Sequence, residues 1–300
     1  MTGNLIDHTD RPLGPFTVGP IGFGCWRLTT PSTNDAVRIV SAAVDLGCTL
    51  VDTADVYGLD WGGTGFGTCE ERLGQVLRAV PGLRNRMVLA TKGGIIPGVP
   101  YDSSATALTA ACEASLRRLG VDHVDLYQVH RPDLFAHPAD VAGTLDALHQ
   151  RGLVRALGVS NHTPAQVAAL QAHLSAPLVS VQPELSAAHL AALRDGTLDQ
   201  AMQHGLAVLA WSPLAGGRLA SGHGVRPELL AVLDRLAAEN GATRSQVALA
   251  FVLSHPSRPV AIVGTQRPDR IAEAVAAASV ALTRRDAYAI IEAAEGLPLP

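Results

Sequence analysis

Lysine is almost absent from this sequence. The chain has 300 residues with 23 lysines and arginines in total, and Lys92 is the only lysine. Arginine stays protonated and presents a planar fork of donors, whereas a lysine ammonium is a compact point charge that fits against a phenol or a carboxylate. Because the chain uses arginine for its other positive charges, we expect a lysine only at a position where arginine cannot replace it. Lys92 is therefore the first candidate for a functional residue.

Several features that define other classes of protein are also missing. The net charge is −4, and the chain has neither a basic cluster nor interleaved aromatic residues, so we expect no nucleic-acid partner. The Gly-x-Gly-x-x-Gly and Walker patterns are absent, which argues against a Rossmann dinucleotide site and a P-loop. Neither a disulfide framework nor a metal site is expected, because the four cysteines lack Cys-x-x-Cys spacing. These are Cys25, Cys48, Cys69 and Cys112.

No segment predicts contact with a membrane. No apolar run approaches the length of a membrane span. The first ten residues have neither the basic region nor the apolar segment of a secretory leader. We therefore expect a cytoplasmic protein without a membrane partner. Nothing in the sequence specifies an oligomeric state.

The chain is organised as eight apolar runs that alternate with helical patterns. The runs are continuously apolar, as expected of parallel strands that are buried on both faces. No linker or internal repeat divides the chain, and 300 residues is an ordinary length for one α/β barrel. We predict a single domain over residues 1–300, built as a (β/α)8 TIM barrel with an N-terminal hairpin near residues 16–18 and extra C-terminal helices.

Local signals predict the ends of individual helices. Ser32 or Thr33 is expected to cap the first helix, and Gly47 to end it in the left-handed conformation. The next helix is expected to open with a capping box at Thr68-Cys-Glu-Glu71, in which a threonine and a glutamate satisfy the first free backbone donors.

Polar residues stand where the predicted strands end. Asp52, Lys92 and His130 each close or follow an apolar run, and Tyr57 lies five residues after Asp52. The carboxyl ends of parallel strands meet on one face of a barrel, where such barrels have their active sites. Each residue alone has an ordinary structural explanation, such as a strand-end cap or a surface charge. The four together, each at or just beyond a predicted strand end, indicate a site.

These four residues, in this order, resemble the catalytic tetrad of the aldo-keto reductases. The similarity extends over nearly the whole chain, and it is closest to a bacterial branch of that family. The segments that carry it include Gly22-Phe-Gly24, His130-Arg-Pro-Asp133, Gly158-Val-Ser-Asn161, Ala210-Trp-Ser-Pro-Leu214 and Val263-Gly264-Thr265. The resemblance implies an oxidoreductase that reduces an aldehyde or ketone to the alcohol, with a small-molecule carbonyl compound as its partner.

The chemistry of the tetrad follows from the acidity of a phenol. A tyrosine has a reference pKa of about 10, too high for an efficient acid near neutral pH. An adjacent ammonium stabilises the phenolate, so we expect Lys92 to lower the pKa of Tyr57 while Asp52 holds Lys92 in place. Tyr57 is then the proton donor to a carbonyl oxygen, and His130 orients that carbonyl.

The resemblance also implies an extended nicotinamide cofactor across the barrel mouth, NADPH rather than NADH. Ser160, Asn161 and Gln182 correspond to the residues that bind the carboxamide, and Trp211 to the residue that stacks on the ring. The remaining cofactor residues are expected in the loops after the last two strands: Ser212, Leu214, Gly216, Gly217, Arg218, Gly264, Thr265, Gln266, Arg270 and Glu273. Arginine and hydroxyl donors in the second loop favour the 2′-phosphate of NADPH.

Substrate contacts are expected from Trp26, Trp61 and Tyr101. Three other hypotheses remain open. The barrel could be a cofactor-sensing subunit with little turnover, it could run in reverse as an alcohol or sugar dehydrogenase, or Lys92 could form a Schiff base in an unrelated lyase or isomerase.

Overall fold

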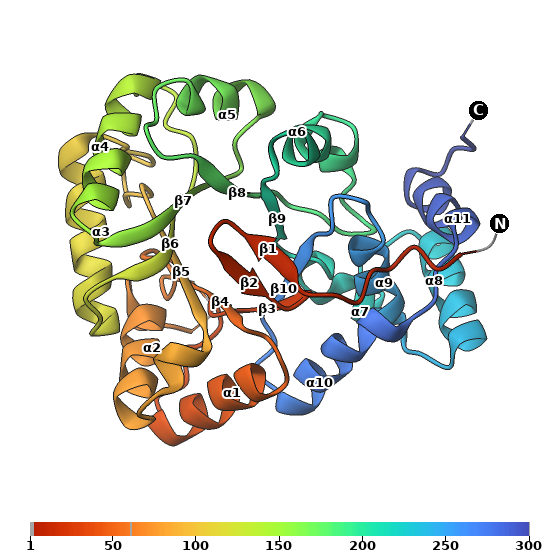
Figure 1. Cartoon of the computed structure of the whole chain (residues 1–300). Coiled ribbons are helices and arrows are strands. Elements are labelled where there is room, and N and C mark those ends of the chain that lie inside the picture. The colour runs from red at the N-terminus through yellow and green to blue at the C-terminus, as the bar shows by residue number, and fades with distance from the viewer. Residues whose placement is uncertain (1–2, 61, 300) are drawn as a thin grey trace.

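A closed barrel of eight parallel strands forms the centre of the molecule (Figure 1). The computed structural model describes residues 3–60 and 62–299. The strands follow one another around the barrel in chain order, and the last pairs with the first. They are β3 (Ile21–Gly24), β4 (Leu50–Asp52), β5 (Val88–Gly93), β6 (Val124–Val129), β7 (Val154–Ser160), β8 (Leu178–Gln182), β9 (Ala207–Ala210) and β10 (Val260–Val263). The predicted (β/α)8 barrel is confirmed.

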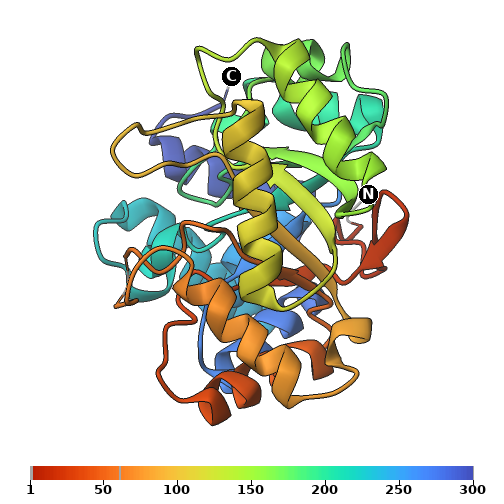
Figure 2. The ribbon, with the colours of Figure 1, turned by 90° about the vertical axis from the view of Figure 1, so that its left-hand side faces the viewer.

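Helices surround the barrel (Figures 1 and 2). They are α1 (Thr33–Asp45), α2 (Thr68–Ala79), α3 (Ala105–Leu119), α4 (Pro138–Gln150), α5 (Pro164–Gln171), α6 (Thr197–His204), α7 (Arg218–Ser221), α8 (Pro227–Asn240), α9 (Arg244–Leu253), α10 (Pro268–Ala276) and α11 (Arg284–Glu295). The extra C-terminal helices are confirmed, with α8 packed against α9 and α11. In the described part of the chain, no helix combines the length and the apolar character needed to cross a membrane.

The predicted N-terminal hairpin closes one end of the barrel. Its strands, β1 (Arg11–Leu13) and β2 (Phe16–Val18), pair antiparallel. Leu13 and Val18 are buried against residues of the barrel interior, which include Leu50 and Leu126. In Figure 2 the hairpin lies at the end opposite to the loops that follow β4 and β5. The other end, where the strands finish, stays open for a site.

Strand alternation points a layer of polar side chains into the open end. Leu50, Ala90 and Leu126 belong to the inner core, whereas Val51 and Tyr127, which follow two of them, belong to the outer core between barrel and helices. Because successive side chains of a strand point to opposite faces, Asp52 and Lys92 share the inward orientation of Leu50 and Ala90. The strands therefore direct these charged groups inward rather than toward the helices.

The helix ends agree with the sequence at the first helix and differ at the second. Ser32 caps α1, since its Oγ accepts a hydrogen bond from the N–H of Asp35 at 3.1 Å, and Gly47 follows with φ of 92°. The prediction of a capping box at Thr68 is wrong. Gly67, at φ of 85°, is the N-cap of α2, and the Thr68 hydroxyl donates to the carbonyl of Gly65 at 2.7 Å. A left-handed glycine turn thus replaces the side-chain cap.

Candidate active site

Lys92 is completely buried at the open end of the barrel. Its Nζ donates to Asp52 Oδ2 at 2.6 Å, to the carbonyl of Thr53 at 2.9 Å and to the hydroxyl of Tyr57 at 3.2 Å. These three bonds use all the donors of an ammonium. Burial by itself lowers the pKa of Lys92, but Asp52 and Tyr57 together raise it above its ordinary value. Lys92 is therefore a charged, fully satisfied ammonium.

Tyr57 is a neutral phenol in this environment. Burial raises its pKa above the ordinary value of 10.0, Lys92 lowers it, and Asp52 raises it again. The sequence analysis expected Lys92 to lower the pKa of Tyr57, and Lys92 does have this effect. The net pKa is nevertheless raised, because the effect of burial is larger than that of the ammonium. A phenol with a raised pKa keeps its proton until an acceptor with developing negative charge reaches it. This is the state that a proton donor needs.

His130 is neutral as well. Burial moves its pKa well below the ordinary value of 6.5, and the positive charges of Lys92 and Arg131 lower it further. Its ring stands edge-on to Tyr57, with 5.7 Å between the ring centroids. Its Nδ1 is buried without a hydrogen-bond partner among the described residues. A neutral imidazole next to the phenol has one N–H with which to orient a carbonyl oxygen.

The second carboxylate oxygen of Asp52 is held by two glutamines. Gln182 Nε2 donates to Asp52 Oδ1 at 3.1 Å, and Gln128 Nε2 donates to the same atom at 3.4 Å. The Ser180 hydroxyl in turn donates to Gln128 Oε1 at 3.4 Å. A Cβ at Gly158 would overlap the Ser180 hydroxyl and crowd Gln128. The sequence missed Gln128, whose only signal is one amide among the inward-facing positions of β6.

A chain of hydrogen bonds connects Trp211 with His130. Trp211 Nε1 donates to Asn161 Oδ1 at 2.9 Å, and Asn161 Nδ2 donates to the His130 carbonyl at 3.2 Å and to Ser160 Oγ at 2.8 Å. The Ser160 hydroxyl donates to the carbonyl of Gln182 at 3.0 Å. Asn161 has φ of 58°, a conformation that asparagine tolerates better than most residues. The three predicted carboxamide ligands thus form one connected group.

Two adjoining cavities open at this end of the barrel. The first, which we call the catalytic pocket, has a volume of about 390 Å³, and the second, the outer cavity, about 400 Å³. Three tetrad members, Asp52, Tyr57 and His130, line the catalytic pocket together with Ser160, Asn161, Gln182 and Trp211. The two cavities share Trp26, Arg27, Ser212 and Gly216 as lining residues. They therefore adjoin across the barrel mouth.

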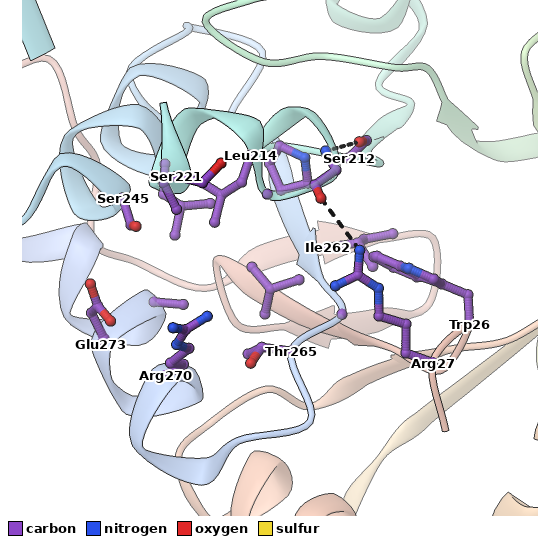
Figure 3. Close-up of a pocket in the computed structure, with 18 residues that line it drawn as sticks. Trp26, Arg27, Ser212, Leu214, Ser221, Ser245, Ile262, Thr265, Arg270 and Glu273 are labelled. Carbon is purple, nitrogen blue, oxygen red and sulfur yellow. Dashed lines mark hydrogen bonds between the residues drawn. The ribbon is translucent and has the colours of Figure 1, made fainter. Parts of the chain in front are cut away.

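The outer cavity contains most of the residues predicted for the far end of the cofactor (Figure 3). These are Ser212, Leu214, Gly216, Gly217, Gly264, Thr265, Arg270 and Glu273. Arg270 is exposed, and its guanidinium has no hydrogen-bond or ion-pair partner among the residues that the structure describes. Glu273 Oε1 accepts a hydrogen bond from the hydroxyl of Thr243 at 2.6 Å. An uncommitted guanidinium and a positioned carboxylate thus lie in one cavity.

Other predicted site residues lie outside the two cavities. Arg218 Nε donates to the carbonyl of Ala215 at 3.1 Å, and Gln266 Nε2 donates to the carbonyl of Gly264 at 3.2 Å. Neither residue lines a cavity. Tyr101 forms an isolated bridge with Ile95, and it is Ile95 that lines the catalytic pocket. The predicted substrate residue Trp61 lies outside the described residues.

The structure adds residues that the sequence did not indicate. Arg27 and Arg131 line the catalytic pocket, and Ser245 at the start of α9 lines the outer cavity. Arg27 Nη2 donates to the carbonyl of Gly216 at 3.4 Å, between residues that line both cavities (Figure 3). Arg27 and Arg131 directly follow Trp26 and His130, so adjacency to predicted residues is the signal that would have found them.

Trp26 rests on two glycines at the open end of the barrel. A Cβ at Gly24 or at Gly264 would overlap the indole ring of Trp26, so only glycine leaves room for the ring at these strand ends. The ring also packs against the inner core of the barrel. Trp26 thereby forms the wall that both cavities share.

Comparisons with known proteins agree on one family. The family model "Aldo/keto reductase family" matches residues 20–295. A 6-dehydroglucose reductase from Novosphingobium aromaticivorans is 47% identical over 306 residues, with 97% of this chain and all of that protein covered. A 6-dehydroglucose reductase from Agrobacterium fabrum is 34% identical, covering 92% and 94%. The solved glycerol dehydrogenase from Gluconobacter oxydans has a TM-score of 0.83 at 28% identity, covering 98% and 97%.

Replacing Gly264 by alanine is expected to displace Trp26. The new methyl group overlaps the indole ring, so the ring must move away from residue 264. The wall that the two cavities share then shifts with it. We expect a change in tryptophan emission of the free protein and weaker binding of ligands at the barrel mouth. Gly143→Ala is the control, because a Cβ at Gly143 in α4 meets no atom within 4 Å. If the emission spectrum of Gly264→Ala were the same as that of wild type, the close contact between the Trp26 ring and Gly264 would be contradicted.

Proposed function

This chain belongs to the aldo/keto reductase family, and we propose that it uses NADPH to reduce the aldehyde of a sugar, 6-dehydroglucose or a close analogue, to a primary alcohol. The family and the names of its relatives establish an NAD(P)H-dependent oxidoreductase that acts on carbonyl compounds. The observation that carries the mechanism is the buried ammonium of Lys92, which donates to both Asp52 and Tyr57 at the wall of the catalytic pocket.

The proton comes from Tyr57. As negative charge develops on the carbonyl oxygen, the phenol donates its proton to it, and Lys92 stabilises the phenolate that remains. Asp52 keeps Lys92 charged and fixes its position, while neutral His130 directs a hydrogen bond to the same oxygen. The nicotinamide, when bound, supplies the hydride to the carbonyl carbon. Burial of the whole group strengthens these interactions, since few water molecules compete for them.

The shape and donors of the cavities fit an extended dinucleotide. The catalytic pocket and the outer cavity adjoin through shared lining residues, which suits a ligand that reaches from Trp211 to Arg270. Trp211 is the candidate platform for the nicotinamide ring. Arg270, Ser245 and Thr265 together offer a guanidinium and two hydroxyls, the donor set that suits a phosphate monoester. This donor set supports NADPH over NADH.

The lining of the catalytic pocket supports a hydroxylated substrate. Asp60 and Arg131 place a carboxylate and a guanidinium in the same pocket as Tyr57 and His130, with Trp26 as an aromatic wall. Carboxylates accept hydrogen bonds from hydroxyls and guanidinium groups donate to them, while an aromatic face packs against the apolar face of a sugar ring. The relatives named 6-dehydroglucose reductase, at 47% and 34% identity, point to the same class of substrate.

The proposal is tested by mixing the protein with NADPH and 6-dehydroglucose and following the absorbance of the reduced cofactor. We expect oxidation that depends on the sugar aldehyde and that exceeds the rate with small apolar aldehydes. Tight NADPH binding without turnover on any sugar aldehyde would favour the cofactor-sensing hypothesis. Absence of NADPH and NADH binding would refute the assignment. Borohydride trapping of a substrate on Lys92 would instead support the Schiff-base hypothesis.

Tyr57→Phe removes the proton donor and leaves the ring in place. We expect kcat to fall by about 10²- to 10⁴-fold, the usual contribution of a general acid, while the NADPH dissociation constant stays within about threefold. Steady-state kinetics and fluorescence titration measure the two quantities on the same preparation. If Tyr57→Phe kept more than about a tenth of the wild-type kcat, Tyr57 would lose the role of acid.

Arg270→Ala removes the guanidinium that faces the outer cavity. A hydrogen bond to a charged group contributes about 1.5–3 kcal/mol, so we expect NADPH to bind about 10- to 100-fold more weakly while NADH affinity hardly changes. Arg267→Ala is the matched control, because Arg267 is exposed and paired with Asp269 outside the cavity. Equal losses for the two cofactors would show that Arg270 does not contact the 2′-phosphate.

A further inference from the structure

Asp55 is a buried carboxyl group that the mechanism does not use. It lies between Asp52 and Tyr57 in the segment after β4, and its exposed fraction is 0%. Neither carboxyl oxygen accepts a hydrogen bond from the described residues. The N–H of Val56 lies close enough to lower the pKa of Asp55 but does not reach hydrogen-bond geometry. Unsatisfied buried carboxyl groups are rare, and one beside a catalytic residue requires an explanation.

The groups around Asp55 disfavour a second negative charge. Glu70 on α2 is fully buried, accepts the Thr91 hydroxyl at 2.5 Å and pairs with Arg118 of α3 at 2.6 Å. Arg118 is thus already committed to one carboxylate. Burial, and then the charge of Glu70, raise the pKa of Asp55 to about 8, against smaller opposing effects of Arg118 and Lys92. The other ionisable groups that sense this cluster carry no positive charge and have raised pKa values: Tyr127 of β6, Cys112 of α3, Cys69 of α2 and Cys25.

The backbone connects Asp55 directly to the catalytic residues. Its N–H donates to the carbonyl of Lys92 at 3.1 Å, and the N–H of Tyr57 donates to the carbonyl of Ala54 at 3.2 Å. The Thr53 carbonyl in turn accepts a hydrogen bond from Lys92 Nζ. One short segment therefore holds both the phenol and a ligand of the ammonium. A displacement of the Asp55 backbone would therefore move Tyr57 relative to Lys92.

We propose that Asp55 is a positioning residue which, as an uncharged carboxylic acid, packs the segment 53–57 against β5, α2 and α3, and whose ionisation displaces Tyr57 and stops proton donation. The uncharged acid lies beside the Glu70–Arg118 pair without needing a counter-ion. The carboxylate needs solvent or a cation, but the two nearby cations are already paired, Arg118 with Glu70 and Lys92 with Asp52. Ionisation therefore drives the side chain outward and carries the Tyr57 segment with it.

The activity test compares wild type with Asp55→Asn, a neutral isostere of the acid. The test rests on the proposed reductase activity. Between about pH 7 and pH 9 the wild-type kcat should fall about tenfold, as expected when one essential proton is lost near the middle of that range. Asp55→Asn should lose this fall, because the pKa of Tyr57 lies above 10.0 and the phenol keeps its proton over the range. The exposed Asp122→Asn is the matched control and should fall as wild type does.

A third variant separates positioning from mere packing. Asp55→Ala is also uncharged but leaves a gap, so its kcat should be low at every pH. Asp55→Asn fills the space, and its kcat at pH 9 should be higher than that of wild type. The NADPH dissociation constant should differ little among the three proteins. Parallel alkaline losses in wild type and Asp55→Asn would overturn the proposal.

A stability measurement tests the same inference without any substrate. The pKa of Asp55 is about 8 in the folded protein and 3.8 ordinarily, so the unfolded chain releases this proton first. The stability that protonated Asp55 contributes is complete below about pH 4, is lost progressively up to about pH 8, and changes no further above that. Asp55→Asn avoids this loss. Its Tm relative to wild type should therefore rise by about 9 °C between pH 4 and pH 8 and then stay level.

The kinetic test and the Tm test distinguish failure of the proposed function from failure of the inference about Asp55. If the protein reduced no sugar aldehyde, the proposed function would fail while the Tm difference would still report on Asp55. If the Tm difference between Asp55→Asn and wild type were the same at all pH values, as expected for Asp122→Asn, Asp55 would be an ordinary ionised carboxylate and the inference would be wrong.

Discussion

The buried ion pair between Lys92 and Asp52 is the constraint around which the rest of the site is built. Moving two charges from water into a protein interior costs several kcal/mol for each ion, and their attraction offsets that cost only when the remaining donors and acceptors are also satisfied. Here they are. Lys92 has three acceptors, and Asp52 receives Gln182 and Gln128 on its other oxygen. The barrel makes this possible because successive strands direct polar groups into one closed layer.

The hydrogen bonds extend from the ion pair to Trp211 on the other side of the catalytic pocket. Gln182 binds Asp52 through its side chain and accepts the Ser160 hydroxyl through its carbonyl. Ser160 accepts from Asn161, and Asn161 accepts from Trp211. Trp211 is thus connected to Asp52 through a chain of side-chain and backbone hydrogen bonds. Several of these groups hold two partners at once, since Asn161 Nδ2 also donates to the His130 carbonyl, so we expect rigid positioning of the whole set.

Much of this could be predicted from the sequence, for identifiable reasons. A single lysine, polar residues at successive strand ends and continuous apolar runs indicated the barrel and the four central residues. Gln128 and Ser245 could not be found in this way, since only tertiary folding brings them beside Asp52 and Arg270. The pKa of Tyr57 depends on how completely folding excludes water, which no local pattern reports. The capping box at Thr68 failed because a left-handed glycine precedes it and satisfies the helix start differently.

Proton donation, as we propose it, requires an ammonium, and not simply a positive charge, between Asp52 and Tyr57. Lys92→Arg tests it most directly, because arginine keeps the charge but replaces a compact donor with a planar fork in a fully buried space. The measurement is kcat/KM for aldehyde reduction beside the NADPH dissociation constant and Tm. We predict a loss of kcat/KM of about 100-fold or more with nearly unchanged NADPH affinity. A folded Lys92→Arg protein with kcat/KM within about threefold of wild type would contradict it.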